Sequence, residues 1–380
     1  MLLRTVILTL LVSMLVITST AQDSSGLRIT LLTCGTGTQP WETFGHSGVR
    51  VIDSFRGTDN VYNYGTFNGY DEDFLIKFTR GKLDYYLSYY PYTEFIREYA
   101  EAGRSVREQE LLLNSGAKLS IYRFLQWNAA EENRYYKYDF FFDNCATRIR
   151  DVFPESLGEG FSFGKALPEG VKLSFRDIIN QYFYRVHWQR FGVNLLLGSR
   201  IDKTMSNEDI MFLPDFLSEG IRTATIQNTR ISTDPVPVVT AGEQAGVGVN
   251  GPLILMLALL ALTMGGVFHS GLHRFISFLL LFLTGFIGCF ILVMWFGTDH
   301  QACQNNYNLL WALPTNLILA FGRRSRKDRY ALIGMFLILI SFLLHILEVQ
   351  QLLLPEFAPL LLALLLTYGM IYRNSKLKTT

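Results

Sequence analysis

The sequence predicts an exported α+β domain followed by a helical transmembrane bundle. Three observations predict this: an apolar stretch at the N-terminus, a mixed composition rich in Tyr and Phe from Gln22 to about residue 250, and a mostly apolar chain from Pro252 onward. The 380 residues suffice for one sizeable domain plus a membrane part. The net charge of +1 gives no strongly basic surface, so we expect no nucleic-acid partner.

Residues 1–21 have the pattern of a secretory signal peptide. Arg4 precedes an apolar run, and Ser19, Thr20 and Ala21 are small residues before Gln22. An uncleaved N-terminal anchor is the alternative. Both interpretations place the following domain outside the cytoplasm.

Residues 22–227 predict a mixed domain with a helical extension at its end. Alternating or β-rich runs predict strands at 27–33, 48–53, 61–65, 83–89 and 106–113. Helical spacing and capping residues predict helices near 73–79, 92–102 and 114–128. After Cys145 the pattern becomes helical, and residues 174–177 and 206–209 each resemble a capping box that opens a helix.

The rest of the chain predicts a linker and a membrane domain. Residues 228–251 are rich in Thr, Pro, Val and Gly without periodicity, which is typical of a linker. Within the membrane domain, 252–380, five apolar segments predict about five spans, at 252–268, 275–296, 308–321, 330–353 and 356–372. The third segment is about 14 residues long, which leaves open whether it spans or re-enters the membrane.

Basic residues predict the orientation of this bundle. They follow the first, third and fifth segments, and the positive-inside rule places those connections in the cytoplasm. The soluble domain then lies on the opposite side, in agreement with the signal peptide.

The stretch 138–151, YDFFFDNCATRIRD, carries the candidate nucleophile. It predicts a strand or tight turn that stops at Asp143 and Asn144, which are good N-cap residues, and a helix that begins at or near Cys145. A thiol in the first turn of a helix has a lowered pKa, and its thiolate is a nucleophile. The alternative is a buried structural cysteine.

The other three cysteines match no zinc or CxxC spacing, and we expect neither a metal nor a cofactor. Cys34 and Cys303 are candidates for a disulfide, because the protein is expected to be exported; the sequence leaves this pairing open. Cys289 lies in an apolar run and is most simply a small hydrophobic residue.

A cysteine nucleophile needs a base, and the soluble domain contains two histidines, His46 and His187. His46 lies at a predicted strand entrance, whereas His187 lies in a predicted helix among aromatic residues and is expected to pack. Here the strand that carries the histidine precedes the helix that carries the cysteine. This is the order found in circularly permuted papain-like domains.

Three further residues are candidates to support this pair. Asn63 or Tyr64, on the adjacent strand, would orient the imidazole, although alternation does not decide which one, and hydrogen bonding within a Tyr-rich sheet is the alternative for both. The backbone N–H of Cys145 and a second donor would form an oxyanion hole. Asn144 is a candidate for that donor, and its capping role explains it equally well.

Several polar residues are candidates for lipid contacts. Arg80 and Arg148 would bind a lipid phosphate, with ion pairs such as that between Arg148 and Asp143 as the alternative. Polar residues at the bilayer are costly and often functional, so the outer connection supplies candidates for head-group binding or for steering the domain: Asp299, His300, Asn306 and Asn308. Interfacial anchoring and helix–helix hydrogen bonds are the alternative.

Six segments together resemble the Bacteroidota-type lipoprotein N-acyltransferase (Lnb) family. They are FGHSGVRV, VYNYGTF, KFTRGKLDYYL, RSVREQELLLN, NRYYKYDFFFDNCATRIRD and MWFGTDHQACQNNYNLLWALPTN. The resemblance implies a permuted papain-like domain, related in layout to NlpC-type hydrolases and the lecithin retinol acyltransferase family, with Cys145 and His46 as catalytic residues. It also implies a multi-pass protein of the bacterial inner membrane with a periplasmic catalytic domain.

The resemblance further implies an acyl transfer from a phospholipid donor, through a thioester on Cys145, to the α-amine of a diacylated lipoprotein acceptor. Other functions would use the same residues. One is a membrane-anchored peptidoglycan peptidase or amidase, or a phospholipase, with the same Cys–His dyad. Another is a non-enzymatic envelope scaffold or sensor in which Cys145 is structural.

Overall fold

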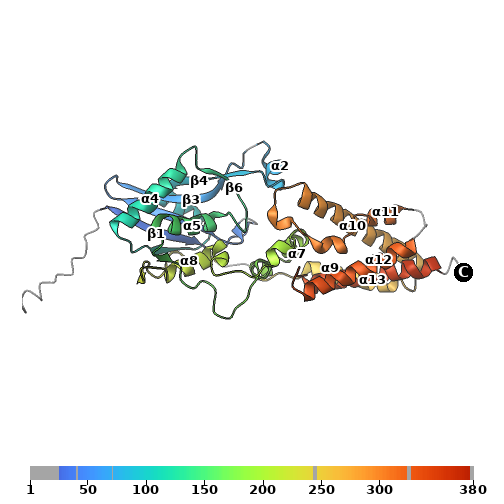
Figure 1. The fold of residues 1–380 in the computed structure, drawn as a ribbon. Coiled ribbons are helices and arrows are strands. Elements are labelled where there is room, and N and C mark those ends of the chain that lie inside the picture. Colours follow the sequence, from blue (N-terminus) through green and yellow to red (C-terminus); the bar gives the residue numbers. More distant parts are fainter. Residues whose placement is uncertain (1–24, 40–41, 71, 243–245, 323–326, 377–380) are drawn as a thin grey trace, which may run out of the picture.

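The computed structural model describes residues 25–39, 42–70, 72–242, 246–322 and 327–376. The predicted signal peptide, residues 1–21, lies outside this range. The described chain forms an α/β domain and an elongated helical part, joined end to end (Figure 1).

A seven-stranded antiparallel sheet forms the centre of the first part, in the order β10-β5-β1-β2-β3-β4-β6. β1 is buried along almost its whole length because helices cover both faces of the sheet, whereas β2 alternates more clearly between buried and half-buried residues. The strands are β1 (Leu27–Cys34), β2 (His46–Asp53), β3 (Thr58–Phe67), β4 (Asp84–Pro91), β5 (Val106–Glu110), β6 (Tyr135–Lys137) and β10 (Val236–Val239).

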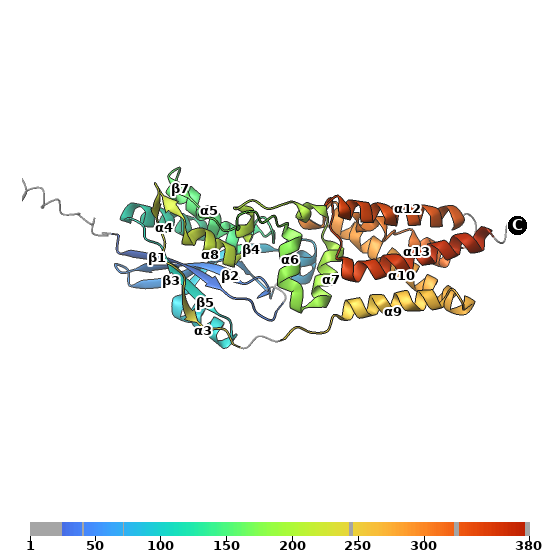
Figure 2. The same cartoon turned by 90° about the horizontal axis from the view of Figure 1, so that it is seen from below.

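Helices cover both faces of this sheet. On one face α4 (Ser115–Ala129) and α5 (Cys145–Leu157) pack on the main hydrophobic core, which includes Ile29 and Val49. On the other face α3 (Tyr92–Glu101) inserts Phe95 into a smaller core (Figure 2). The mixed α and β architecture is therefore confirmed.

The predicted elements appear with small shifts. The strand predicted at 106–113 ends at Glu110, and the helix predicted near 73–79 is α2 (Phe74–Thr79). The capping pattern at 206–209 opens only a 3-10 helix, η4 (Asp209–Phe212), although Ser206 and Asp209 do cap each other.

After α5 the chain is mostly helical, as predicted. Its elements are β7 (Phe161–Ser162), α6 (Phe175–Tyr182), η2 (Phe183–Arg185), α7 (His187–Leu196), η3 (Ser199–Asp202), α8 (Pro214–Arg222), β8 (Thr225–Ile226) and β9 (Thr229–Arg230). The three short strands form a second sheet in the order β7-β8-β9.

The predicted linker, residues 228–251, contains regular structure in its first half. β9 pairs with β8, and β10 extends the main sheet by pairing with β5. Between them Ile231 and Ser232 are buried. Thr and Val are also common in strands, so the composition that predicts a linker is equally compatible with these short edge strands.

The helical part contains α9 (Gly251–Gly265), α10 (Ser270–Phe296), α11 (Asn316–Phe321), α12 (Lys327–Ile346) and α13 (Leu354–Lys376). Among the described residues three helices, α10, α12 and α13, are long and apolar enough to cross a membrane, rather than the five expected. α9 is apolar but has only 15 residues. The third predicted segment breaks into a 3-10 turn, η6 (Tyr307–Leu310), and the six-residue α11, because Pro314 interrupts the backbone hydrogen-bond pattern.

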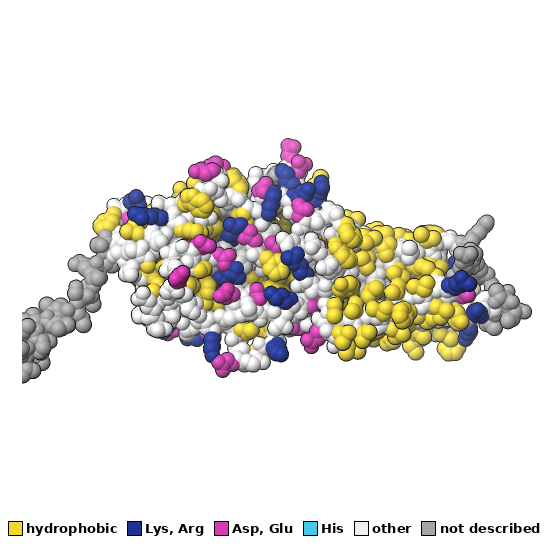
Figure 3. Space-filling view, viewed as in Figure 1, with side chains coloured by type: hydrophobic (Ala, Val, Ile, Leu, Met, Phe, Trp, Pro, Cys, Tyr) yellow, Lys and Arg dark blue, Asp and Glu magenta, His cyan; other side chains and the backbone are white. Residues whose placement is uncertain are grey.

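The two ends of the helical part differ in charge. His273, Arg274 and Lys327 line one pocket together with Asn374, at the end remote from the α/β domain. Exposed hydrophobic side chains cover the surface between that end and the domain (Figure 3). The clustering of basic side chains at the far end agrees with the orientation predicted from charge.

Buried hydrogen bonds hold the two parts together. Gln351, in the connection between α12 and α13, donates its backbone N–H to Asp202, which is itself paired with the buried Arg176. Arg190 of α7 forms a 2.6 Å ion pair with the fully buried Glu356 of α13. The α/β domain is therefore docked on the helical part through side chains, besides being connected to it by the chain.

Candidate active site

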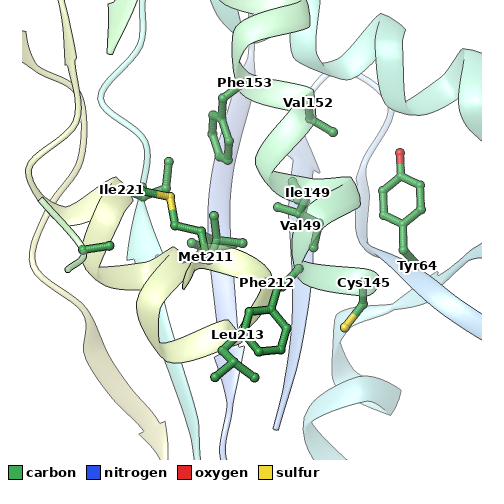
Figure 4. Close-up of a cluster of buried hydrophobic side chains, with 14 of the residues drawn as sticks. Val49, Tyr64, Cys145, Ile149, Val152, Phe153, Met211, Phe212, Leu213 and Ile221 are labelled. Atoms are coloured by element: carbon green, nitrogen blue, oxygen red, sulfur yellow. The ribbon is translucent and has the colours of Figure 1, made fainter. Parts of the chain in front are cut away.

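Cys145 is the first residue of α5, as the capping pattern predicts. Asn144 caps the helix, since its Oδ1 accepts from the backbone N–H of Thr147 at 2.9 Å and its own N–H donates to the Thr147 hydroxyl at 2.7 Å. A tight turn precedes it, in which Asp139 and Asp143 exchange two backbone hydrogen bonds. Ile149 and Phe153 anchor α5 in the core, so the first turn is held rigidly (Figure 4).

The side chain of Asn144 is fully engaged in this cap. Its amide nitrogen donates to the carbonyls of Phe140 and Phe212, both at 2.8 Å, and its oxygen accepts from Thr147. This leaves it no donor for an oxyanion, so the capping role explains its presence.

His46 is the first residue of β2 and lies beside Cys145. Gly45, just before it, has φ +77°, and a Cβ there would stand 2.5 Å from the carbonyl oxygen of Cys34. Only glycine accommodates this entry into the strand. The imidazole and the Cys145 thiol are close enough for each to shift the pKa of the other.

Asn63, on β3, supplies the third member of the group. Its Oδ1 is hydrogen-bonded to Nε2 of His46, which leaves Nδ1 to face the sulfur. Tyr64 lies on the opposite side of the strand, buried in the main core, and burial raises the pKa of its hydroxyl. Of the two residues that alternation leaves open, Asn63 is therefore the one whose side chain contacts His46.

A β-bulge sets this geometry. The pairing of β3 with β4 shifts register between Asn63 and Thr66, and Gly65 between them has φ +89°. A Cβ on Gly65 would lie 3.6 Å from the Cβ of Cys145. The bulge therefore brings β3 against the start of α5.

The thiol and the imidazole shift each other's pKa values. Burial alone would raise the pKa of Cys145, but the charge of His46 and its hydrogen bond, with backbone N–H groups of Ser47 and Ala146, outweigh burial and lower it. Burial alone would lower the pKa of His46. The Cys145 sulfur and Asn63 have a larger effect than burial, and the pKa of His46 is raised. The arrangement therefore favours a thiolate–imidazolium pair.

Sequence reasoning missed two contributors, the backbone N–H of Ser47 and the bulge at Gly65. Ser47 directly follows His46, so the sequence already places it near the site. The sequence does not show that its backbone N–H points toward the Cys145 sulfur. Gly65 lies inside a predicted strand, and a glycine at such a position is a sequence signal for a bulge.

The two arginine candidates have different surroundings. Arg148 pairs with Asp143, with 2.6 Å between Nη2 and Oδ2, and stacks over the ring of Tyr136 at 4.2 Å. Arg80 follows α2 and is exposed, and its side chain forms no ion pair or hydrogen bond with any described residue. The structure therefore gives Arg148 an intramolecular partner and leaves Arg80 accessible.

The four outer-connection candidates separate into two pairs. Asn306 and Asn308 are buried, and their amide groups donate to backbone carbonyls of Asn194, Leu195 and Leu196 in α7. They join the two parts of the protein rather than lying open to a head group. Asp299 and His300 contact α2 instead: the N–H of Asp299 donates to the carbonyl of Arg80 at 2.9 Å.

His187 stands apart from the Cys145 group. It begins α7, and its Nε2 is hydrogen-bonded to the carbonyl of Gly248 at 3.1 Å. This structural contact agrees with the expectation that His187 packs rather than reacts.

The remaining cysteines are not paired with each other. Cys34 and Cys303 are both free and buried, so the structure does not contain the disulfide that the sequence left open. Within the described ranges, no three His, Cys, Asp or Glu side chains come together as a metal ion would require.

The fold and the site define a membrane protein in which a docked α/β domain brings Cys145, His46 and Asn63 together. Residues 18–182 match the Lnb N-terminal periplasmic domain, and residues 250–379 match the Lnb transmembrane domain. The chain belongs to the Lnb family, and it is a membrane protein with a periplasmic domain. Neither the curated proteins nor the solved structures contain a match.

Proposed function

We propose that this protein is a lipoprotein N-acyltransferase that carries the acyl group on Cys145. The donor is a phospholipid, and the acceptor is the α-amine of an N-terminal diacylglyceryl-cysteine. The grouping of Cys145, His46 and Asn63, on a domain docked against membrane helices, is the observation that carries the proposal. Membership of the Lnb family supports it.

In the first half-reaction the thiolate of Cys145 attacks the carbonyl carbon of a phospholipid ester. The negative charge moves to the carbonyl oxygen, where the free N–H groups at the start of α5 are placed to stabilise it. The ester C–O bond then breaks, and His46 gives its proton to the departing oxygen. The products are a thioester on Cys145 and a lysophospholipid.

In the second half-reaction the neutral amine of the acceptor attacks the thioester carbonyl. His46 accepts the proton that the amine loses, and the C–S bond breaks. The products are an amide on the acceptor and the regenerated thiolate. Asn63 holds the imidazole with Nδ1 toward the sulfur in both steps, which suits a base that must also act as an acid.

The order of His46 on a strand and Cys145 on a later helix supports a circularly permuted papain-like arrangement for this domain. The basic end of the helical part, remote from the domain, supports a multi-pass protein of the inner membrane with that end in the cytoplasm. Both substrates are then anchored in the same membrane as the enzyme.

The test is to incubate the purified full chain with phospholipid vesicles and analyse it by mass spectrometry. We expect one acyl group on the Cys145 peptide, an equal amount of lysophospholipid, and transfer to a diacylated lipopeptide when it is added. Cys145→Ser should abolish the thioester. Cys289→Ser, a control in the apolar helix α10, should retain it.

Three results would contradict the proposal. Release of fatty acid to water even in the presence of the acceptor would indicate a phospholipase. Cleavage of peptidoglycan without any lysophospholipid would indicate a peptidase or amidase. Normal lipoprotein N-acylation in cells that carry only Cys145→Ser would indicate a structural cysteine.

A further inference from the structure

The short helix α2 exposes an apolar face that the α/β domain does not cover. Leu75 is 71% exposed, Ile76 is 61% exposed and Phe78 is 49% exposed. None of the six residues of α2 is buried. Burying large apolar side chains is favourable, so three of them on one short helix indicate a surface that meets something apolar.

Glu72 and Asp73 precede this helix, so the charge on its N-terminal side is negative, whereas the charge on its C-terminal side is positive. Arg80 and Lys82 follow α2 directly and are exposed. Charged side chains of both signs lie over α2, where the polar domain meets the hydrophobic surface of the helical part (Figure 3). Apolar residues next to basic ones are the pattern of helices that lie in the head-group region of a membrane.

α2 is fixed at the end of a candidate membrane span. Nε2 of His300 is hydrogen-bonded to the carbonyls of Phe78 and Thr79, each at 3.1 Å. The N–H of Asp299 bonds the carbonyl of Arg80, and a Cβ on Gly81 would meet the backbone nitrogen of His300 at 3.2 Å. These contacts hold α2 beside the last turn of α10.

The last turn of α10 marks a membrane–water interface. Trp295 and Phe296 stack there with ring centroids 4.9 Å apart, and α10 ends at Phe296. Aromatic residues gather where spanning helices leave the hydrocarbon. Because Asp299 follows within three residues, the contacts of this loop place α2 at the depth of the same interface.

Aromatic rings connect α2 with the active site. Phe78 stacks on Phe74 and Phe74 stacks on Phe67, whereas Phe67 meets Tyr85 edge to face, with ring centroids 5.4–5.8 Å apart. The ring of Tyr85 stacks at 4.4 Å on that of Tyr138. Tyr138 and Cys145 then meet at Gly65, where a Cβ would lie within 3.7 Å of both side chains.

We propose that α2 inserts its apolar face into the membrane leaflet that faces the α/β domain, and that the aromatic row from Phe78 to Tyr138 guides a lipid acyl ester from that leaflet to Cys145. The insertion itself rests on α2 and its contacts with the 299–300 loop. The guiding role rests on the proposed acyl transfer. Arg80, at the end of α2, is placed to contact the lipid phosphate.

The insertion is tested with the full chain in vesicles of phosphatidylcholine whose acyl chains carry bromine, which quenches tryptophan fluorescence inside the bilayer. Leu75→Trp and Ile76→Trp add a reporter on α2, and the signal of the five native tryptophans is subtracted. Phe55→Trp is the control, because Phe55 is similarly exposed but lies in the β2–β3 turn. We expect quenching at 75 and 76 and none at 55.

The guiding role is tested with the double variant Leu75→Gln/Ile76→Gln and two acyl donors. Thioester formation from phospholipid vesicles should fall about tenfold, since the helix loses apolar contact with the bilayer. Thioester formation from water-soluble p-nitrophenyl acetate should remain at the parental rate, which also shows that the variant is folded. Phe55→Gln should behave as the parent with both donors.

Each result decides one part. Absence of quenching at 75 and 76 overturns the insertion, including the case in which a second protein copy covers α2. Equal losses with both donors, or no loss with vesicles, overturn the guiding role. If the parent forms no thioester from either donor, the proposed acyl transfer fails, while the quenching result still decides whether α2 is inserted.

Discussion

Asn63 and His46 meet where two neighbouring strands separate. The regular pairing of β2 with β3 runs from Asp53 and Thr58 to Val49 and Tyr62, and the hydrogen bond between the two side chains lies just beyond it. The start of α5 fills the adjacent space. The reactive group therefore forms at an edge of regular structure that several elements define together.

Removing the Asn63 amide should slow the reaction without unfolding the domain. In Asn63→Ala the imidazole loses its orienting partner, so thioester formation should fall about a hundredfold. Asn60→Ala, three residues earlier on β3, is the matched control and should retain the parental rate. The measurement is the rate of acylation of the Cys145 peptide, with melting temperature as the check on folding. An Asn63→Ala rate equal to that of the parent would remove Asn63 from the mechanism.

The pH dependence of Cys145 alkylation should reveal its pairing with His46. Because the thiol pKa is lowered and the imidazole pKa is raised, the ion pair exists between these two values, and iodoacetamide should react below the ordinary thiol pKa of about 8.5. His46→Ala leaves a buried thiol without its cation, so the alkylation curve should move to higher pH. At neutral pH the rate should fall about tenfold for each unit of that movement.

His187→Ala is the control for this experiment, since His187 bonds only the Gly248 carbonyl among the described residues. Its alkylation curve should coincide with that of the parent. Coinciding curves for His46→Ala and the parent would instead show that His46 does not influence the thiol.

A methyl group on Gly65 should impair the reaction more than the fold. Gly65 and Gly57 both have positive φ, +89° and +66°, so alanine at either position should cost about 1–2 kcal/mol of stability. Only Gly65 adjoins Cys145; a Cβ on Gly57 meets nothing within 4 Å. We therefore expect similar losses in melting temperature for the two variants and at least about a tenfold slower thioester formation for Gly65→Ala alone. Equal rates in both variants would show that the bulge does not position the site.

The buried pair of Arg176 and Asp202 should be a major contributor to stability. Arg176 bonds Asp202 at 2.7 Å and also Asn194 and two backbone carbonyls, with both charged side chains only 1% exposed. Arg176→Ala leaves Asp202 buried without its cation, which should cost about 3–5 kcal/mol, or roughly 10 °C in melting temperature. Lys203→Ala, at an exposed ion pair, should change little. Melting of the detergent-solubilised protein distinguishes the two.

Local signals in the sequence were sufficient for part of the site. The helix at Cys145 follows from Asp143 and Asn144, because capping depends on residues within one turn. His46 followed from its type and its place at a strand entrance. The choice of Asn63 over Tyr64 needed the structure, since alternation places the two side chains on opposite sides of β3 but does not say which side His46 occupies.

Non-local pairing explains what the sequence did not reveal. β10 joins β5 across more than a hundred residues, and its short Val-rich run, which contains Pro237, carries no strong strand pattern of its own. Asn306 and Asn308 appeared as candidates for head-group binding because polar residues near a bilayer are unusual. Their partners, the carbonyls at the end of α7, are distant in sequence and became visible only in the fold.

The pairing of β10 with β5 and the bonds of Gln351 and His300 have a mechanical consequence. A flexible linker of about twenty residues would allow displacements of about 25 Å between the domain and the membrane helices. With the domain docked at several separated points, Cys145 instead keeps one height above the membrane. In the proposed reaction, an acceptor whose folded body begins close to its lipidated end could not bring its amine to that height. The enzyme would then select acceptors by the length of the flexible chain that follows the lipidated residue.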